Sequence, residues 1–193
     1  MNKLIFISLL LSVSLFLLFY PFFKHLVSYL HPIVLVVVIF FLFILVLFIL
    51  LFMYKKTIYI PHSLFLWIFI LYTLALLVLL FFRPDDQDYH SINLLPFATI
   101  NYYLTGKVAG IVSFYNLAAN IGLFIPYGIL LKVKSYSVRK LIFIPILFIS
   151  LIESFQFITH RGSLDIDDLI LNLLGVYIGY LLYPLFKRIF QLY

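Results

Sequence analysis

The feature that most limits the fold is a series of long apolar runs that nearly fills the chain. Six runs are visible, at residues 4–23, 33–54, 61–82, 109–131, 141–158 and 169–186. Their lengths approach the roughly 20 residues that a helix needs to cross a hydrocarbon core of about 30 Å. In lipid, backbone N–H and C=O groups must find their hydrogen-bond partners within a helix or a closed barrel. These runs lack the alternation of apolar and polar residues that is typical of barrel strands. The sequence therefore predicts an all-α, polytopic membrane bundle of about six transmembrane helices.

Composition supports lipid as the main solvent. Of the 193 residues, 66% are apolar and 10% are charged, with a mean hydropathy of +1.21, whereas a soluble domain is about half apolar and a quarter charged. The net charge is +6, but the basic residues lie between apolar runs rather than in an exposed basic patch. We therefore expect the lipid bilayer and not nucleic acid as a partner. The absence of cysteine excludes a disulfide framework and a thiol nucleophile.

The first run resembles a signal peptide in its charge pattern but not in its length. It follows Lys3, continues to Phe23 and lacks a small-residue cleavage site, so we expect a retained first helix.

The basic residues predict the orientation, because cytoplasmic flanks carry the excess of Lys and Arg. With the N-terminus inside, nine fall on the cytoplasmic side: Lys3, Lys55, Lys56, Lys132, Lys134, Arg139, Lys140, Lys187 and Arg188. Four fall outside: Lys24, Arg83, Lys107 and Arg161. Both termini of this multi-pass membrane protein are therefore expected in the cytoplasm.

All seven acidic residues then fall on the outer side. They are Asp85, Asp86, Asp88, Glu153, Asp165, Asp167 and Asp168. Since orientation depends mainly on Lys and Arg, this placement indicates work at the outer face. Residues 1–82 are expected to form an anchor half of three helices and residues 83–193 a half that carries the polar motifs, within one integral domain.

The 83–108 loop offers two polar features. Asp85, Asp86 and Asp88 could bind a hard cation such as Mg²⁺ or Ca²⁺, or form a solvated turn after Pro84. The apolar stretch Asn93-Leu94-Leu95-Pro96-Phe97 predicts a segment that lies at the membrane interface or dips back into the protein.

Amides and a carboxylate lie inside the fourth and fifth runs. Asn116 and Asn120 share one helical face, where they serve helix adhesion or a site. Glu153 and Gln156 are adjacent on a face of the fifth run, with Glu153 roughly 7.5 Å inside its outer end at 1.5 Å per residue. An intramembrane carboxylate is costly and is a candidate for function.

The sixth run begins with a dense acidic segment. Asp165 suits an N-cap, and Asp167 and Asp168 suit the positive end of the helix dipole, so capping alone could explain them. Asp168, Asn172, Gly175 and Gly179 form one stripe. The Gly175–Gly179 spacing permits close approach of a neighbour, which we expect to be the fifth helix, bringing Asp168 and Asn172 near Glu153 and Gln156.

These residues predict one polar cluster at the outer leaflet. The candidate catalytic residues are Glu153, Asp165, Asp168 and Arg161, with Arg161 as the counter-charge, and the candidate binding residues are Gln156, Asn172, Asn120, Asn116 and Asn93. An acid-rich site either binds a cation or holds a protonated carboxyl for acid–base work. A divalent cation would be held by Asp165, Asp168 and Glu153; His160 is interpreted as incidental.

Four ordered motifs in residues 90–182 resemble the VanZ family of small bacterial membrane proteins. They are Asn93-Leu94-Leu95-Pro96-Phe97; Asn116…Asn120-Ile121-Gly122-Leu123-Phe124-Ile125-Pro126-Tyr127-Gly128; Glu153-Ser154-Phe155-Gln156; and Arg161…Asp165-Ile166-Asp167-Asp168…Asn172…Gly175…Gly179. The resemblance implies a role at the cell envelope in tolerance of glycopeptide antibiotics of the teicoplanin type. It implies no known reaction.

Four functions remain open at this point. The first is a VanZ-like envelope protein that reduces access by glycopeptides through its outer acidic cluster. The second is a metal-dependent or acid–base hydrolase or transferase that acts on a lipid-linked or cell-wall precursor. The third is a transporter, which the apolar inner halves of the last two helices disfavour. The fourth is a structural partner of other envelope proteins, in an oligomeric state that the sequence does not define.

Overall fold

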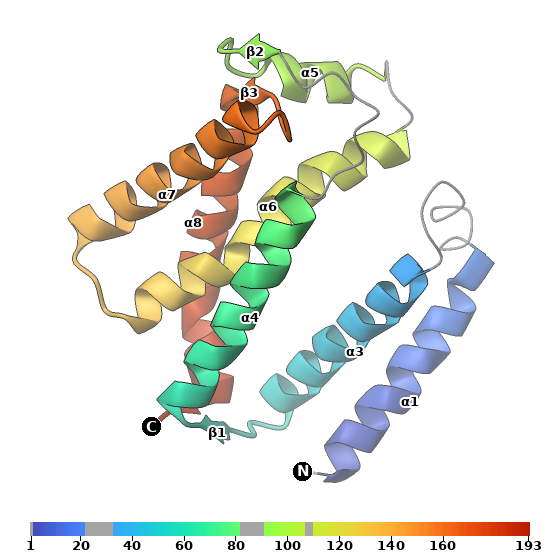
Figure 1. The fold of residues 1–193 in the computed structure, drawn as a ribbon. Coiled ribbons are helices and arrows are strands. Elements are labelled where there is room, and N and C mark those ends of the chain that lie inside the picture. Colours follow the sequence, from blue (N-terminus) through green and yellow to red (C-terminus); the bar gives the residue numbers. More distant parts are fainter. Residues whose placement is uncertain (1, 22–32, 82–90, 107–109) are drawn as a thin grey trace. The chain divides into compact units, whose positions relative to one another are not determined.

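A computed structural model of the chain describes residues 2–21, 33–81, 91–106 and 110–193. Helices dominate these residues (Figure 1). They are α1 (Asn2–Leu18), α3 (Ile33–Met53), α4 (His62–Phe81), α5 (Ala98–Leu104), α6 (Gly110–Val133), α7 (Val138–Ile158) and α8 (Ile166–Ile189). The helical fold predicted from the apolar runs is confirmed.

Four helices in the described part of the chain are long and apolar enough to cross a membrane. They cover His62–Phe81, Ser113–Val133, Val138–Ile158 and Ile166–Ile189. The first two predicted runs contain α1, of 17 residues, and α3, of 21 residues, which are not among these four. A total of six crossings and the cytoplasmic position of both termini therefore stay predictions.

Two short parallel ladders accompany the helices, and the sequence did not predict them. β1 (Ile58–Ile60) pairs with β4 (Phe190–Leu192), and β2 (Ile92–Asn93) pairs with β3 (Leu164–Asp165). Strands of two or three residues are too short to show a period of two. The β2–β3 ladder matters for function because it joins the 91–106 segment to the start of α8.

The chain divides into two compact units. One comprises Met1–Ile60 with Lys187–Tyr193, and the other comprises Pro61–Phe186. In the first unit α1 contacts α3, and β1 pairs with β4. The structural division falls after Ile60, so α4 belongs with the polar-motif helices; the assignment of an anchoring role to residues 1–82 stays a prediction.

The second unit is a bundle of α4, α6, α7 and α8 around an apolar and aromatic core. Phe124, Ile149 and Val176 are almost completely buried there. Tyr127 contacts the ring of Phe69 edge-on, with 5.1 Å between the ring centroids. The core thus connects all four helices of this bundle through apolar and aromatic side chains.

Close packing inside this bundle occurs between α8 and α6. A Cβ atom added at Gly175 would lie 2.1 Å from the Ile121 carbonyl oxygen, and one at Gly179 would lie 2.2 Å from that of Ile125. The prediction that the glycine pair packs on α7 is therefore wrong. The stripe faces both neighbours, and its small residues contact α6 while the longer Asn172 side chain reaches α7.

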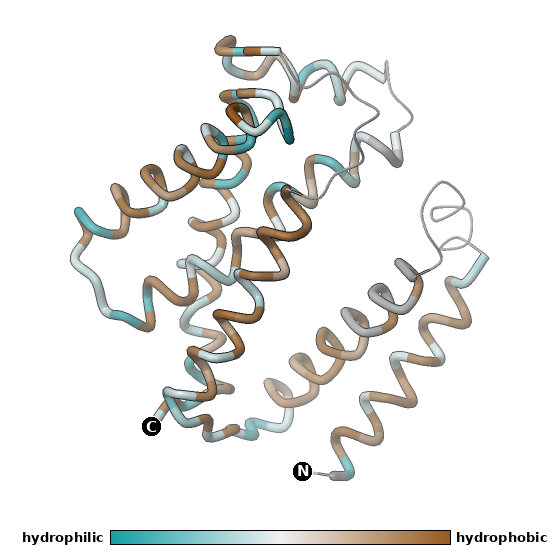
Figure 2. The backbone as a smooth tube through the Cα atoms, viewed as in Figure 1, coloured by the Kyte–Doolittle hydropathy of each residue, from teal (hydrophilic) through white to brown (hydrophobic). Residues whose placement is uncertain are grey.

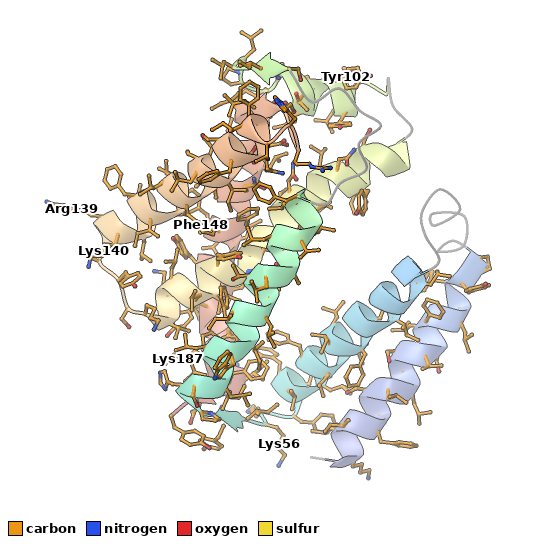
Figure 3. The ribbon with its side chains drawn as sticks, in the orientation of Figure 1. Lys56, Tyr102, Arg139, Lys140, Phe148 and Lys187 are labelled. Atoms are coloured by element: carbon orange, nitrogen blue, oxygen red, sulfur yellow. The ribbon has the colours of Figure 1, made fainter. Side chains whose placement is uncertain are left out.

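Polarity is segregated along this bundle. Figure 2 shows hydrophobic residues along the helices and hydrophilic residues at their ends. The segments β2, β3 and α5 lie together at one end (Figure 1). Arg139 and Lys140 lie at the α6–α7 end, away from Tyr102 on α5 (Figure 3). The four described acids of the bundle, Glu153, Asp165, Asp167 and Asp168, lie towards the end that carries α5.

Candidate functional site

Glu153 and Asn172 form a buried pair between α7 and α8. The Asn172 side-chain amide donates a 3.0 Å hydrogen bond to Glu153 Oε1. Glu153 is 6% exposed and Asn172 is 4% exposed. The predicted approach of these two residues is confirmed, and the amide supplies one of the donors that a carboxylate needs at this depth.

Gln156 lies one turn further along α7 and serves the end of α4. Its side-chain amide donates a 3.1 Å hydrogen bond to the Leu80 carbonyl. That carbonyl is in the last turn of α4, and the residue four positions on is Pro84, which has no N–H to donate. Gln156 therefore satisfies a helix-end carbonyl, which is a structural role for a residue predicted to bind ligand.

His160 has a structural role at the C-terminal end of α7. The N–H of Arg161 donates to the Gln156 carbonyl at 2.8 Å, and the N–H of His160 donates to that of Phe157 at 3.1 Å. This pair of bonds is the Schellman motif, with His160 at the left-handed position at a φ of 57°. The motif turns the chain directly from α7 into the segment that carries the aspartates.

Asp165 caps α8 and also binds the 91–106 segment. Its Oδ1 accepts the Asp167 backbone N–H at 2.9 Å, which confirms the predicted N-cap. Its Oδ2 accepts the Thr99 hydroxyl at 2.5 Å, and the Asn93 amide lies 3.4 Å from both carboxylate oxygens. Capping and contact with the 91–106 segment are therefore combined in one side chain.

Asp167 caps a second helix that lies far away in sequence. Its carboxylate accepts the backbone N–H groups of Phe97 at 2.5 Å, Thr99 at 2.8 Å and Ile100 at 3.1 Å. Phe97 precedes α5 in a left-handed conformation, with a φ of 65°, which is uncommon for a bulky residue. Asp167 is 0% exposed, so this carboxylate fixes both the start of α5 and the strained residue before it.

Asp168 binds a side chain of α6. The Asn120 amide donates a 2.5 Å hydrogen bond to Asp168 Oδ1, and the predicted approach of Asp168 to Glu153 stays a prediction. On the same helix, Asn116 donates to the Tyr103 hydroxyl oxygen at 3.2 Å. Burial raises the pKa of Tyr103 above its usual value, and the negative charge of Asp168 raises it further.

A small pocket lies where α7, the 91–106 segment and the start of α8 meet. Its volume is about 120 Å³, and its walls are Leu94, Ser150, Glu153, Ser154, Leu164, Asp165, Ile166 and Leu169. Two acidic and two hydroxyl-bearing residues thus belong to walls whose surface is mostly apolar. The pocket unites two of the four predicted catalytic residues, Glu153 and Asp165.

The other predicted residues lie around the pocket rather than in its walls. Asp168 binds Asn120 and Gln156 binds Leu80, and Arg161 is half-buried in the turn after α7. The role of Arg161 as counter-charge stays a prediction.

Among the described residues no three His, Cys, Asp or Glu side chains form a group that could hold a metal ion. Asp165, Asp168 and Glu153 therefore do not converge as the cation hypothesis requires, and the aspartates of 85–88 lie outside the described residues.

Sequence reasoning missed the functions of Asp167, Thr99 and Tyr103. Asp167 was visible as a first-turn acid of α8, but its three donors are 67 to 70 positions away. The sequence did offer one signal of further contacts, which is the number of aspartates at the start of α8. An N-cap needs only one of the three, so the other two were available for other partners.

Comparisons with known proteins agree with the resemblance. A family model described as VanZ/LLP1 matches residues 69–187, which include every residue of the site. Protein VanZ of Enterococcus faecium is 34% identical over 106 residues, which are 52% of this chain and 58% of that protein. The chain thus spans less than two thirds of the length of that relative. No solved structure matches the chain.

Proposed function

The chain belongs to the VanZ/LLP1 family, and from this premise we propose that it lowers susceptibility to glycopeptides of the teicoplanin type at the bacterial plasma membrane. The similarity to Protein VanZ of Enterococcus faecium supports this setting. Glycopeptides act outside the cell, so the proposal requires a site that faces outward.

The distribution of charge supports such a site. The α6–α7 connection carries Lys132, Lys134, Arg139 and Lys140, whereas the acids of the bundle lie towards the α5 end. Because cytoplasmic loops carry the excess of Lys and Arg, the α6–α7 connection is cytoplasmic and the acidic end faces out. Four or six crossings both place the two ends of the chain on one side.

The observation that carries the proposal is the pocket with Glu153 and Asp165 in its walls. Glu153 is a carboxylate inside a membrane helix, where ionisable groups are rare and usually functional. Its bond to Asn172 fixes the position of the side chain. A fixed carboxylate beside a small outward pocket can engage a polar group of an envelope component while the aliphatic wall contacts its apolar part.

Expression in a glycopeptide-sensitive Gram-positive host tests the proposal. We expect the chain to raise the teicoplanin concentration needed to stop growth, with membrane abundance verified in the same cells. Unchanged susceptibility at verified abundance would contradict the proposed function.

A second candidate function is a hydrolase or transferase that acts on a lipid-linked or cell-wall precursor. The observation that favours it is the same pair of acids with Ser150 and Ser154 in one pocket. Glu153 would act as acid–base and Asp165 as electrostatic partner, since acid–base groups contribute about 10²–10⁴-fold to catalysis. Lipid and cell-wall profiles of cells with wild-type chain and with Glu153→Gln test it, and identical profiles would exclude it if the variant has lost tolerance.

A further inference from the structure

Four basic residues converge at the ladder that β1 forms with β4. Lys55 and Lys56 come shortly before β1, and Lys187 and Arg188 come shortly before β4. The two strands are parallel, so both pairs enter the ladder from the same end, where neighbouring strands are about 4.8 Å apart. Lys56 and Lys187 are labelled in Figure 3. We call these four residues the basic cluster.

The end of α3 holds the basic cluster in place. The N–H of Lys56 donates to the Leu51 carbonyl at 3.0 Å. The N–H of Lys55 donates to the Phe52 carbonyl at 3.2 Å, and Lys55 has a φ of 51°. These bonds form a second Schellman motif. The guanidinium of Arg188 lies 4.5 Å from the centroid of the Phe52 ring, so the same turn also positions a residue of the second pair.

The charge of the basic cluster is largely unbalanced. Its structural unit comprises Met1–Ile60 and Lys187–Tyr193, and neither range contains Asp or Glu. All four basic side chains are exposed. Basic residues also offset the dipoles at helix C-termini, but each dipole carries only about half a negative charge there. The ends of α3 and α8 together therefore offset about one of the four positive charges.

The basic cluster lies at the opposite end of α8 from the acidic residues. Asp167 and Asp168 are in the first turn of this helix, and Lys187 and Arg188 are in its last turn. The helix has 24 residues and is roughly 36 Å long at 1.5 Å per residue, which exceeds the hydrocarbon thickness of about 30 Å. The basic cluster therefore reaches the head groups of the leaflet opposite to the acidic end.

Exposed tyrosines flank the basic cluster. Tyr54 directly before Lys55 is 58% exposed, and Tyr59 on β1 is 67% exposed. Tyrosine is enriched where membrane helices meet the head groups, because its ring contacts apolar carbons while its hydroxyl stays in contact with water. Positive charge and exposed tyrosine rings together match the phosphate and the adjoining carbons of a phospholipid.

We propose that the basic cluster binds the phosphate of an anionic phospholipid, such as phosphatidylglycerol, in the leaflet opposite to the acidic end. The lysine ammonium groups and the Arg188 guanidinium donate charge-assisted hydrogen bonds to the phosphate oxygens. The rings of Tyr54 and Tyr59 contact the glycerol and the first acyl carbons. Basic groups beside membrane helices attract anionic lipids in this way. The inference goes beyond the proposed function, since it concerns the other end of α8.

Native mass spectrometry of the purified full chain in a non-ionic detergent tests the binding. The probe is dioleoyl phosphatidylglycerol, and its matched control is dioleoyl phosphatidylcholine, which has the same acyl chains but no net charge. We expect the first phosphatidylglycerol to bind at least about tenfold more tightly than the first phosphatidylcholine, because the basic cluster attracts net negative charge. Added salt should weaken the binding of phosphatidylglycerol.

Paired substitutions assign the binding to the basic cluster. Lys56→Gln with Lys187→Gln removes one charge from each segment and should weaken phosphatidylglycerol binding about 30-fold. Lys56→Arg with Lys187→Arg keeps both charges and should keep the affinity. The matched control is Lys134→Gln with Arg139→Gln, which removes the same charge from exposed residues at the α6–α7 connection. This control should also keep the affinity.

Three results would overturn the proposal. Equal binding of the two lipids would show no preference for negative charge. The same loss of affinity in both glutamine pairs, or in neither, would show that the basic cluster is not the site. Binding of glycerol 3-phosphate as tight as that of phosphatidylglycerol would show a site for free phosphate rather than for a lipid. No antibiotic is present in these measurements, so their outcome is independent of teicoplanin tolerance in cells.

Discussion

The carboxylate of Asp167 accepts the backbone N–H of Thr99 at 2.8 Å and thereby joins two segments that are 68 positions apart. The same carboxylate holds the N–H groups of Phe97 and Ile100. The start of α8 therefore caps α5 across the bundle and positions the segment that supplies Leu94 to the pocket. Asp165, Asp167 and Asp168 thus make three different contacts, with α8 itself, with α5 and with α6.

Replacement of this carboxylate should release α5. Asp167→Ala leaves three backbone donors without their acceptor, and an unsatisfied buried group costs about 1–3 kcal/mol. We expect a lower free energy of unfolding and faster proteolysis within residues 91–106, measured by limited digestion in detergent. Asp167→Asn, which retains one carbonyl acceptor, should lie between the variant and the wild type, and identical digestion of all three would show that the cap is not needed.

The contact between α8 and α6 predicts a sharp difference between two glycines. Gly179→Ala places a Cβ 2.2 Å from the Ile125 carbonyl oxygen, and overpacking of this kind costs about 1–3 kcal/mol. Gly122→Ala on α6 meets nothing within 4 Å and is the matched control. Thermal unfolding in detergent should show a lower midpoint for Gly179→Ala only, and equal midpoints would refute the close contact.

Some contacts of the bundle could be predicted from the sequence and others could not. The spans of α4, α6, α7 and α8 follow from apolar runs of about 20 residues, and the bond of Glu153 with Asn172 follows from a short turn between two helices. The neighbour of Gly175 and Gly179 was predicted wrongly, because a GxxxG spacing indicates close packing but not the identity of the partner. The partners of Asp167 could not be predicted, since they are backbone groups, and every residue except proline offers the same N–H.

Tyr103 provides a test that depends on pH. Its pKa is raised above 10.0 in the folded chain, so the folded state holds the phenolic proton more tightly than the unfolded state does. The stabilisation is fully present below pH 10 and is lost as the pH rises from there through the folded pKa. The difference in unfolding midpoint between wild type and Tyr103→Phe should thus be constant below about pH 10 and should fall above it. A constant difference throughout would contradict the raised pKa.

Orientation can be measured directly because the chain contains no cysteine. Single substitutions Tyr102→Cys and Ser135→Cys mark the α5 end and the α6–α7 connection. A membrane-impermeant maleimide should label the first in intact cells and the second only after lysis. Ser28→Cys, in the part outside the described residues, should also react in intact cells if the first two runs both cross the membrane, and its protection would favour four crossings.

The most direct test of the pocket is teicoplanin susceptibility with Glu153→Gln, which keeps the shape and the acceptor for Asn172 but removes the charge. The growth-inhibiting concentration should fall to that of cells without the chain, at membrane abundance equal to wild type, while the exposed neighbour Phe155→Leu keeps full tolerance. Wild-type tolerance in Glu153→Gln cells at equal abundance would contradict the account.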